Sequence, residues 1–209
     1  MSFALECKKV RRTGFLPAFL GGGVLAAAVP VLNMAFRSEM YVNINASPVN
    51  ILLGANWQMM TMLNILLIVA GACIMYNTEY ADNTIQRMCT LPTKESTIFF
   101  GKTVVLITAS IMLLVIEAVS VFFCSVHWFP QSADLYMEIL KNFGFFLLLM
   151  LPAVLLSLLI ASVCKNMWIS LGIGGVCVFL ATMIPTQNFA LILFPFALPF
   201  QMYLIRPPM

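Results

Sequence analysis

Five long apolar stretches, separated by short polar segments, dominate the pattern of residues along the chain. Each stretch is close to the ~20 residues that an α-helix needs to cross the hydrocarbon core of a membrane. None shows the alternation of apolar and polar side chains, over segments of about ten residues, that a membrane β-barrel requires. The pattern predicts an all-α polytopic membrane protein, with transmembrane helices at about residues 15–36, 51–76, 103–123, 143–163 and 167–184.

A sixth apolar stretch, residues 189–205, is short and contains Pro195 and Pro199. Proline lacks a backbone donor and disrupts the interior of a helix, so both residues argue against a straight span. Two interpretations are open. The stretch could be a cramped sixth span that ends inside the cell near Arg206. It could also be a kinked or re-entrant segment on the outer side, with a sixth span beyond residue 209. The prolines favour the second interpretation.

Composition supports a membrane protein and removes several other classes. Of the 209 residues, 62% are hydrophobic and 9% are charged, and the mean hydropathy is +0.99. A soluble domain of this size cannot bury so much apolar surface. The uncharged stretch 13–36 exceeds the ~7–15 apolar residues of a signal peptide, so we expect a retained first span. The six cysteines form no C-x-x-C pair, so we interpret them as small apolar side chains or free thiols and expect no metal site.

The positions of lysine and arginine predict the orientation in the membrane. If the N-terminus is cytoplasmic, the inner segments contain Lys8, Lys9, Arg11, Arg12, Arg87, Lys94, Lys102 and Lys165. The outer loops then contain only Arg37 and Lys141 before the C-terminal tail. Because cytoplasmic loops of membrane proteins carry an excess of these residues, we expect the N-terminus inside. The first long cytoplasmic loop is then residues 79–102.

That loop is the longest strongly polar run in the chain. Apolar residues recur in it at the spacing of one helical face, at Ala81, Ile85, Met88 and Leu91. Asp82 or Asn83 can cap this short helix, and Pro92 ends it. A second helix is then expected to run through Lys102 into the third span. The loop is predicted to be a hairpin of two helices, which we call the cytoplasmic hairpin.

The cytoplasmic hairpin presents an apolar ridge with polar residues on either side. A helix presented in this way can lie in a groove on another protein. It can also be a solvated connection between two spans, or a helix that lies in the lipid interface. Periodicity alone leaves these three interpretations open.

The hairpin resembles the loop that follows the second span in ABC-2 type permeases. The resemblance rests on Glu79, Thr84, Leu91, Pro92, Lys94, Gly101 and Lys102. Asn83 stands where the family often has glycine, and Thr93 and Lys94 stand where serine and arginine are frequent. In that family the loop is the coupling helix that docks on the nucleotide-binding subunit. The resemblance therefore implies ATPase-coupling roles for Glu79, Asp82, Ile85, Arg87, Met88, Leu91, Pro92 and Lys94.

The resemblance extends to the rest of the chain. Residues 1–14 are similar to the basic amphipathic segment that lies along the inner membrane surface in this family. Residues 1–209 are then one permease domain, in contact with lipid, in a bacterial plasma membrane. No G-x-x-x-x-G-K-[ST] motif occurs, so the chain is not expected to be an enzyme or to bind a cofactor. ATP and magnesium are expected on a partner P-loop ATPase, and a second permease subunit, identical or different, is also implied. Nucleic-acid binding has no support.

The small size and the PFALPF segment near the end are most similar to the permeases of lantibiotic (bacteriocin) immunity and peptide-antibiotic export. This similarity implies a subunit of an ATP-driven exporter. Such an exporter expels an amphipathic substrate, for example an antimicrobial peptide, from the membrane to the outside, and so confers immunity. The alternative function is a non-transporting assembly or sensor subunit that docks a cytoplasmic partner through residues 79–102.

Glu117 is the one acidic residue well inside a predicted span. An intramembrane charge is costly, so Glu117 is a candidate for a proton relay or a substrate contact. The interpretation that we favour is structural: a protonated or hydrogen-bonded side chain, paired with a polar group on another helix such as Asn64.

Small residues predict where helices approach closely. In the first span, Gly22 is four residues before Ala26, and Gly23 is four residues before Ala27. The fifth span contains Gly172, Gly174 and Gly175. Two interpretations are open: the close packing is within the chain, or it is against a second permease subunit.

Overall fold

The computed structural model describes residues 13–42, 44, 46–81, 95–130, 134–164, 166–183 and 193–204, without the side chains of residues 79, 81, 95 and 202–204. Its elements are α2 (Phe15–Val42), α3 (Pro48–Ala81), α5 (Glu95–Trp128), α6 (Leu135–Val163), α7 (Met167–Met183) and the short 3₁₀ helix η1 (Leu198–Leu204). The described residues form no β-strand. The predicted all-α fold is therefore confirmed for the part of the chain that is described.

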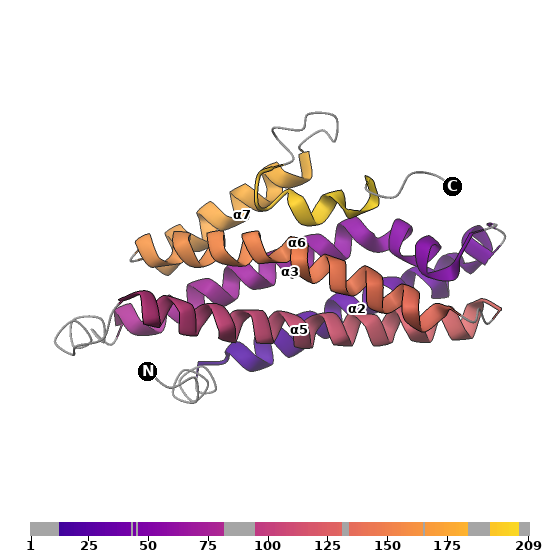
Figure 1. The fold of residues 1–209 in the computed structure, drawn as a ribbon, viewed down its shortest axis with the longest axis horizontal. Helices are drawn as coiled ribbons and strands as arrows, with labels where there is room; N and C mark the ends of the chain where they lie inside the picture. Colours follow the sequence, from indigo (N-terminus) through magenta and orange to yellow (C-terminus); the bar gives the residue numbers. More distant parts are fainter. Residues whose placement is uncertain are drawn as a thin grey trace.

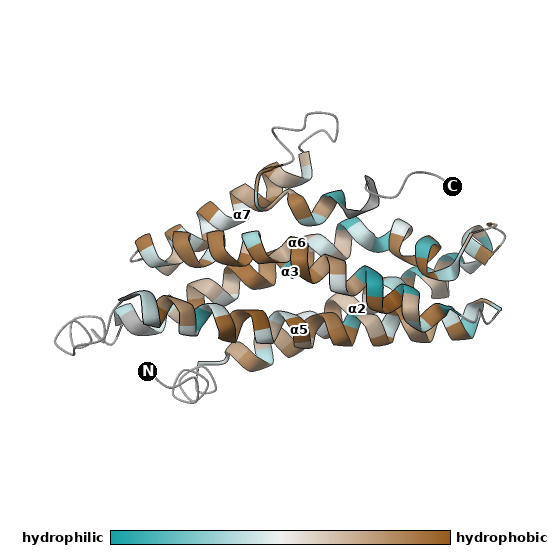
Figure 2. Cartoon of the chain, in the orientation of Figure 1, coloured by the Kyte–Doolittle hydropathy of each residue, from teal (hydrophilic) through white to brown (hydrophobic). Residues whose placement is uncertain are grey.

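The four longest helices lie lengthwise in one elongated bundle, and α7 crosses its upper side (Figure 1). Apolar residues cover most of their length (Figure 2). α2, α3, α5 and α6 are each long and apolar enough to cross a membrane. α7 has 17 residues, or about 25 Å at 1.5 Å per residue, which is shorter than the ~30 Å hydrocarbon core. Four of the five predicted spans thus have the full length, and the fifth is an apolar helix that falls short of it.

Two helices begin well before the predicted span. α5 begins at Glu95 and continues without a break through Lys102 into the apolar part. This agrees with the prediction that the second helix of the hairpin runs into the third span. α6 begins at Leu135 and includes Glu138 and Asn142, whose side chains lie in the first turns of the helix. Hydropathy locates only the apolar part of a helix, and polar turns can continue it beyond the hydrocarbon.

α3 is the centre of the bundle, because it contacts every other described element. Fully buried apolar side chains along its length, such as Leu52, Ile65 and Ile68, form the core with residues from the surrounding helices. α2, in contrast, exposes large apolar side chains such as Leu25 and Phe36. In a membrane such exposed residues face lipid or another subunit.

Glycines set the closest approaches between helices. A Cβ atom at Gly22 of α2 would lie 2.4 Å from Leu67 of α3, and one at Gly174 of α7 would lie 2.3 Å from Val69 of α3. The predicted close packing at these two positions is therefore internal to the chain. Gly172 and Gly175 differ, because a Cβ at either would meet nothing within 4 Å.

The backbone is irregular just before α2 and at two positions inside it. Gly14, just before it, has a φ of +74°, which a glycine adopts readily at a turn. Pro30 lies inside the helix, and Arg37 has non-helical angles that mark a kink. One turn before Pro30, the Ala27 carbonyl oxygen accepts a hydrogen bond from the Ser120 hydroxyl of α5. This contact joins α2 to α5 beside the proline. The carbonyl oxygen that loses its intrahelical donor is that of Ala26, four residues before Pro30.

The last apolar stretch is not a straight helix where it is described. Pro195 lies in a turn, and η1 has 7 residues, about 14 Å at the 2.0 Å rise of a 3₁₀ helix. Phe196 and Ala197 are fully buried in a cluster with Val178 and Ala181 of α7. Trp57 of α3 donates its indole N–H to the Pro199 carbonyl oxygen at 3.0 Å. This part of the chain therefore agrees with a kinked or re-entrant segment rather than a sixth spanning helix.

Candidate functional site

Most of the predicted coupling residues lie outside the described part of the chain. These are Asp82, Ile85, Arg87, Met88, Leu91, Pro92 and Lys94. Glu79 lies in the last turn of α3, but its side chain is not described. What the structure does describe is the two helical stems of the cytoplasmic hairpin, the last turns of α3 and the first turns of α5.

The two stems lie side by side at one end of the bundle, on the left in Figure 1. α3 and α5 have 34 residues each, so each is about 51 Å long, well beyond the ~30 Å of the hydrocarbon core. Neither contains an internal proline. The structure therefore flanks residues 82–94 with two helices that continue without an internal proline into the apolar part of the bundle.

Lys102 joins the two stems. Its side chain is 1% exposed, and its Nζ donates a hydrogen bond to the Met75 carbonyl oxygen of α3 at 3.2 Å. The same ammonium lies 4.9 Å from the centre of the Tyr76 ring, within the range of a cation–π contact. The sequence interpretation counted Lys102 only as an inner-surface charge and as part of the resemblance, so it missed this link between helices.

A tyrosine extends the contact to α6. The Tyr80 hydroxyl donates to the Ser162 carbonyl oxygen, one residue before α6 ends at Val163. The Tyr76 and Tyr80 rings are neighbours on α3, with centroids 6.5 Å apart. Side chains of α3 and α5 therefore connect the ends of three helices at the hairpin end. We call Lys102, Tyr76 and Tyr80 the stem contact.

The predicted intramembrane pair is present in the middle of the bundle. Asn64 of α3 donates its Nδ2 to Oε2 of Glu117 on α5 at 3.1 Å, and both side chains are fully buried. Among the described residues, the Asn64 Oδ1, the Glu117 Oε1 and the hydroxyl of Thr61, one turn away on α3, have no hydrogen-bond partner. The pair joins the two helices that carry the hairpin.

A second polar contact was not predicted. Asn33 of α2 donates its side-chain amide to Oδ1 of Asn56 on α3 at 2.8 Å, and Asn56 donates to the Leu52 carbonyl oxygen at 2.9 Å. The sequence feature that could have predicted this contact is an asparagine within each of two neighbouring apolar stretches. Interhelical amide contacts of this kind hold membrane helices in register.

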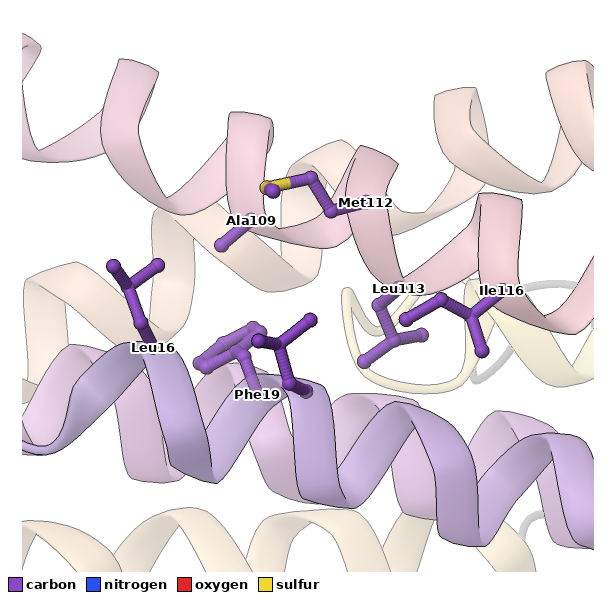
Figure 3. Close-up of a pocket in the computed structure, with 7 residues that line it drawn as sticks. Leu16, Phe19, Ala109, Met112, Leu113 and Ile116 are labelled. Carbon is purple, nitrogen blue, oxygen red and sulfur yellow. The ribbon is translucent and has the colours of Figure 1, made fainter.

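A small pocket between α2 and α5 has an entirely apolar lining. Figure 3 shows side chains from both helices pointing into it, among them Leu16, Phe19, Met112 and Ile116. No polar side chain lines it, so it offers no group that would fix the orientation of a ligand. We assign no binding function to it.

Comparison with known proteins identifies the family. The family model described as "ABC-2 family transporter protein" matches residues 2–181, which is most of the chain. No curated protein and no solved structure matches. The matched region covers all five described α-helices except the last two residues of α7. The family is one of membrane transport components that are not themselves catalytic, and membership implies an ABC ATPase as partner. The chain therefore belongs to the ABC-2 transporter family, as a multi-pass permease subunit of an ABC transporter.

Proposed function

We propose that this permease subunit belongs to an exporter that expels an amphipathic substrate, such as a lantibiotic or another antimicrobial peptide, from the membrane to the outside. The observation that carries the proposal is the pair of unbroken stems on either side of residues 82–94. A partner that moves the hairpin would move the two central membrane helices directly. The similarity of the PFALPF segment to peptide-immunity permeases supports the choice of substrate class.

The energy is proposed to enter through the hairpin. The chain has no P-loop motif, so ATP and magnesium would be bound by the partner ATPase. Ile85, Met88 and Leu91 would form the apolar ridge that seats in a groove of that ATPase. The flanking charged residues, Arg87 among them, would face polar groups at the edges of the groove.

Movement of the hairpin is proposed to rock part of the bundle. α3 contacts α2 and α7 as well as α5, so displacement of α3 would carry α2 and α7 with it against a second permease subunit. The exposed side chains of α2 are largely apolar. An amphipathic substrate could leave the membrane along such a surface with its apolar side still covered.

The proposed environment is a bacterial plasma membrane with the N-terminus inside. Residues 1–14 would lie along the cytoplasmic surface, where their basic side chains attract anionic lipid. The second permease subunit, identical or different, remains part of the proposal.

The substitution Met88→Asp tests the proposal. A charge buried without a partner costs about 3–5 kcal/mol, so binding of the ATPase should weaken by at least ~100-fold. Insertion of the permease should be unchanged, because the ridge contributes nothing to spanning. We expect normal expression, no copurification of the ATPase, and loss of peptide resistance in cells.

Lys165→Ala, in the loop between α6 and α7, is the control. This variant should retain both the copurification of the ATPase and the peptide resistance of the cells. A Met88→Asp chain that keeps its ATPase and its activity would show that the hairpin is only a connector. Retained ATPase binding in wild type without any transport would favour the assembly or sensor function instead.

A further inference from the structure

We propose that Lys102 is a positioning residue: it locks the two stems of the cytoplasmic hairpin together, and with Tyr80 it passes the movement of the hairpin to α6. This inference rests on the proposed function, because it requires that an ATPase moves the hairpin. It adds a contact between the hairpin stems and the last turn of α6, a helix whose chain connection to α5 lies at the opposite end of the bundle (Figure 1).

The placement of Lys102 is the first reason. Its Nζ reaches across the hairpin to the Met75 carbonyl oxygen, 27 residues earlier in the sequence. The same carbonyl oxygen accepts a hydrogen bond from the Thr78 hydroxyl at 3.0 Å. Two polar side chains from two stems therefore meet at one backbone atom. Without such a link, a force on the hairpin could be absorbed by sliding of one stem along the other.

The chemistry of the link is the second reason. Burial of an ammonium group is unfavourable unless hydrogen bonds or a π-face replace its water. An apolar side chain would fill the same space without that penalty, so packing alone does not account for a lysine here. What a lysine adds is directional contacts, among them one with the Met75 carbonyl oxygen and one with the Tyr76 ring, both on α3.

The connection to α6 is the third reason. Tyr80 lies one turn beyond Tyr76 on α3, and its hydroxyl donates to the Ser162 carbonyl oxygen. Ser162 is close to the short connection between α6 and α7. Coupling between distant parts of a protein is carried by such chains of packed side chains and hydrogen bonds. The stem contact therefore leads from α5 through α3 to the end of α6.

Hydrogen–deuterium exchange of the permease–ATPase complex, with and without ATP plus vanadate, tests the inference. In wild type, nucleotide should change the exchange of residues 96–102 and also of residues 158–163. In Lys102→Met, the ATPase should still copurify and the response of residues 96–102 should remain. The response of residues 158–163 should fall to less than half. Lys102→Arg should restore it, because arginine keeps the charge and the donors.

Lys141→Met, which removes an exposed lysine of α6, is the matched control and should respond as wild type does. A wild-type response of residues 158–163 in Lys102→Met would overturn the inference and leave the proposed function intact. If Lys102→Met does not fold, the same exchange measurement is made on Tyr80→Phe, which removes only the hydroxyl that donates to α6. The response of residues 158–163 to nucleotide should then fall. An unchanged response there also overturns the inference. If nucleotide does not change the exchange of residues 96–102 in wild type, the proposed function is overturned, and this inference with it.

Discussion

At the scale of single residues, the carboxyl group of Glu117 is the most informative, because it lies in the apolar middle of the bundle. It accepts a hydrogen bond from Asn64 on the neighbouring helix. Hydrogen bonds between membrane helices contribute about 0.6–2 kcal/mol, and a buried donor left without a partner costs about 1–3 kcal/mol. The contact is therefore large enough to matter for the stability of the α3–α5 pair.

We expect Glu117→Ala to lower the stability of the purified permease by about 2–4 kcal/mol, because it leaves Asn64 without its acceptor and opens a cavity. Glu117→Gln keeps an oxygen acceptor and the volume, so it should lie within about 1 kcal/mol of wild type and retain activity. Denaturation followed by tryptophan fluorescence measures both. A Glu117→Gln chain that is stable but inactive would refute the structural role and favour a proton relay or substrate contact.

Polar residues inside apolar stretches can be recognised from the sequence. The residues that they contact could be predicted for only some of them. Asn64 was named as one example of a polar group on another helix that could pair with Glu117, and the structure shows that pair. Lys102 was classed as a surface charge, since counting charges gives no information on whether a long side chain turns outward or across a hairpin. The contact between Asn33 and Asn56 depends on helix rotation, which hydropathy does not fix.

At the scale of helices, Gly174 holds α7 against α3. A Cβ at this position would lie 2.3 Å from Cγ1 of Val69, and a β-branched residue in a helix has little freedom to move away. We expect Gly174→Ala to destabilise the protein by about 1–3 kcal/mol, the usual range for overpacking. Gly172→Ala, where a Cβ meets nothing within 4 Å, should be neutral. Thermal denaturation of the two variants in one detergent makes the comparison, and equal midpoints would contradict the packing role.

Hydropathy located the apolar helices but not their full extent. The polar first turns of α5 were expected, because a second helix was predicted to follow Pro92 and to run through Lys102 into the third span. The early start of α6 at Leu135 was not expected, because Glu138 and Lys141 lower the hydropathy there. α7 ends at Met183, short of a full span. In the last apolar stretch, Pro195 and Pro199 gave a physical reason to expect an irregular segment, and tertiary contacts with α7 and Trp57 decide its path.

At the scale of the whole molecule, the two ends of the bundle carry different connections between helices (Figure 1). One carries the hairpin stems and the stem contact, and the other carries the connections between α2 and α3 and between α5 and α6 (Figure 1). α3 runs between the two ends and contacts every other described element. Under the proposed coupling, an ATPase that displaces the hairpin end would displace α3, which contacts the whole bundle. That coupling requires the hairpin end to face the cytoplasm, where the ATPase binds ATP.

Cysteine labelling in intact cells tests that orientation. The excess of lysine and arginine in the N-terminal segment and the hairpin predicts that both are cytoplasmic. In a chain without its native cysteines, Arg87→Cys should be protected from an impermeant thiol reagent, whereas Asp134→Cys, at the exposed start of α6, should react. Permeabilised cells serve as the control, in which both positions should be labelled. The opposite pattern would place the hairpin outside the cell, where no ATPase could move it, and would remove the basis for coupling through this segment.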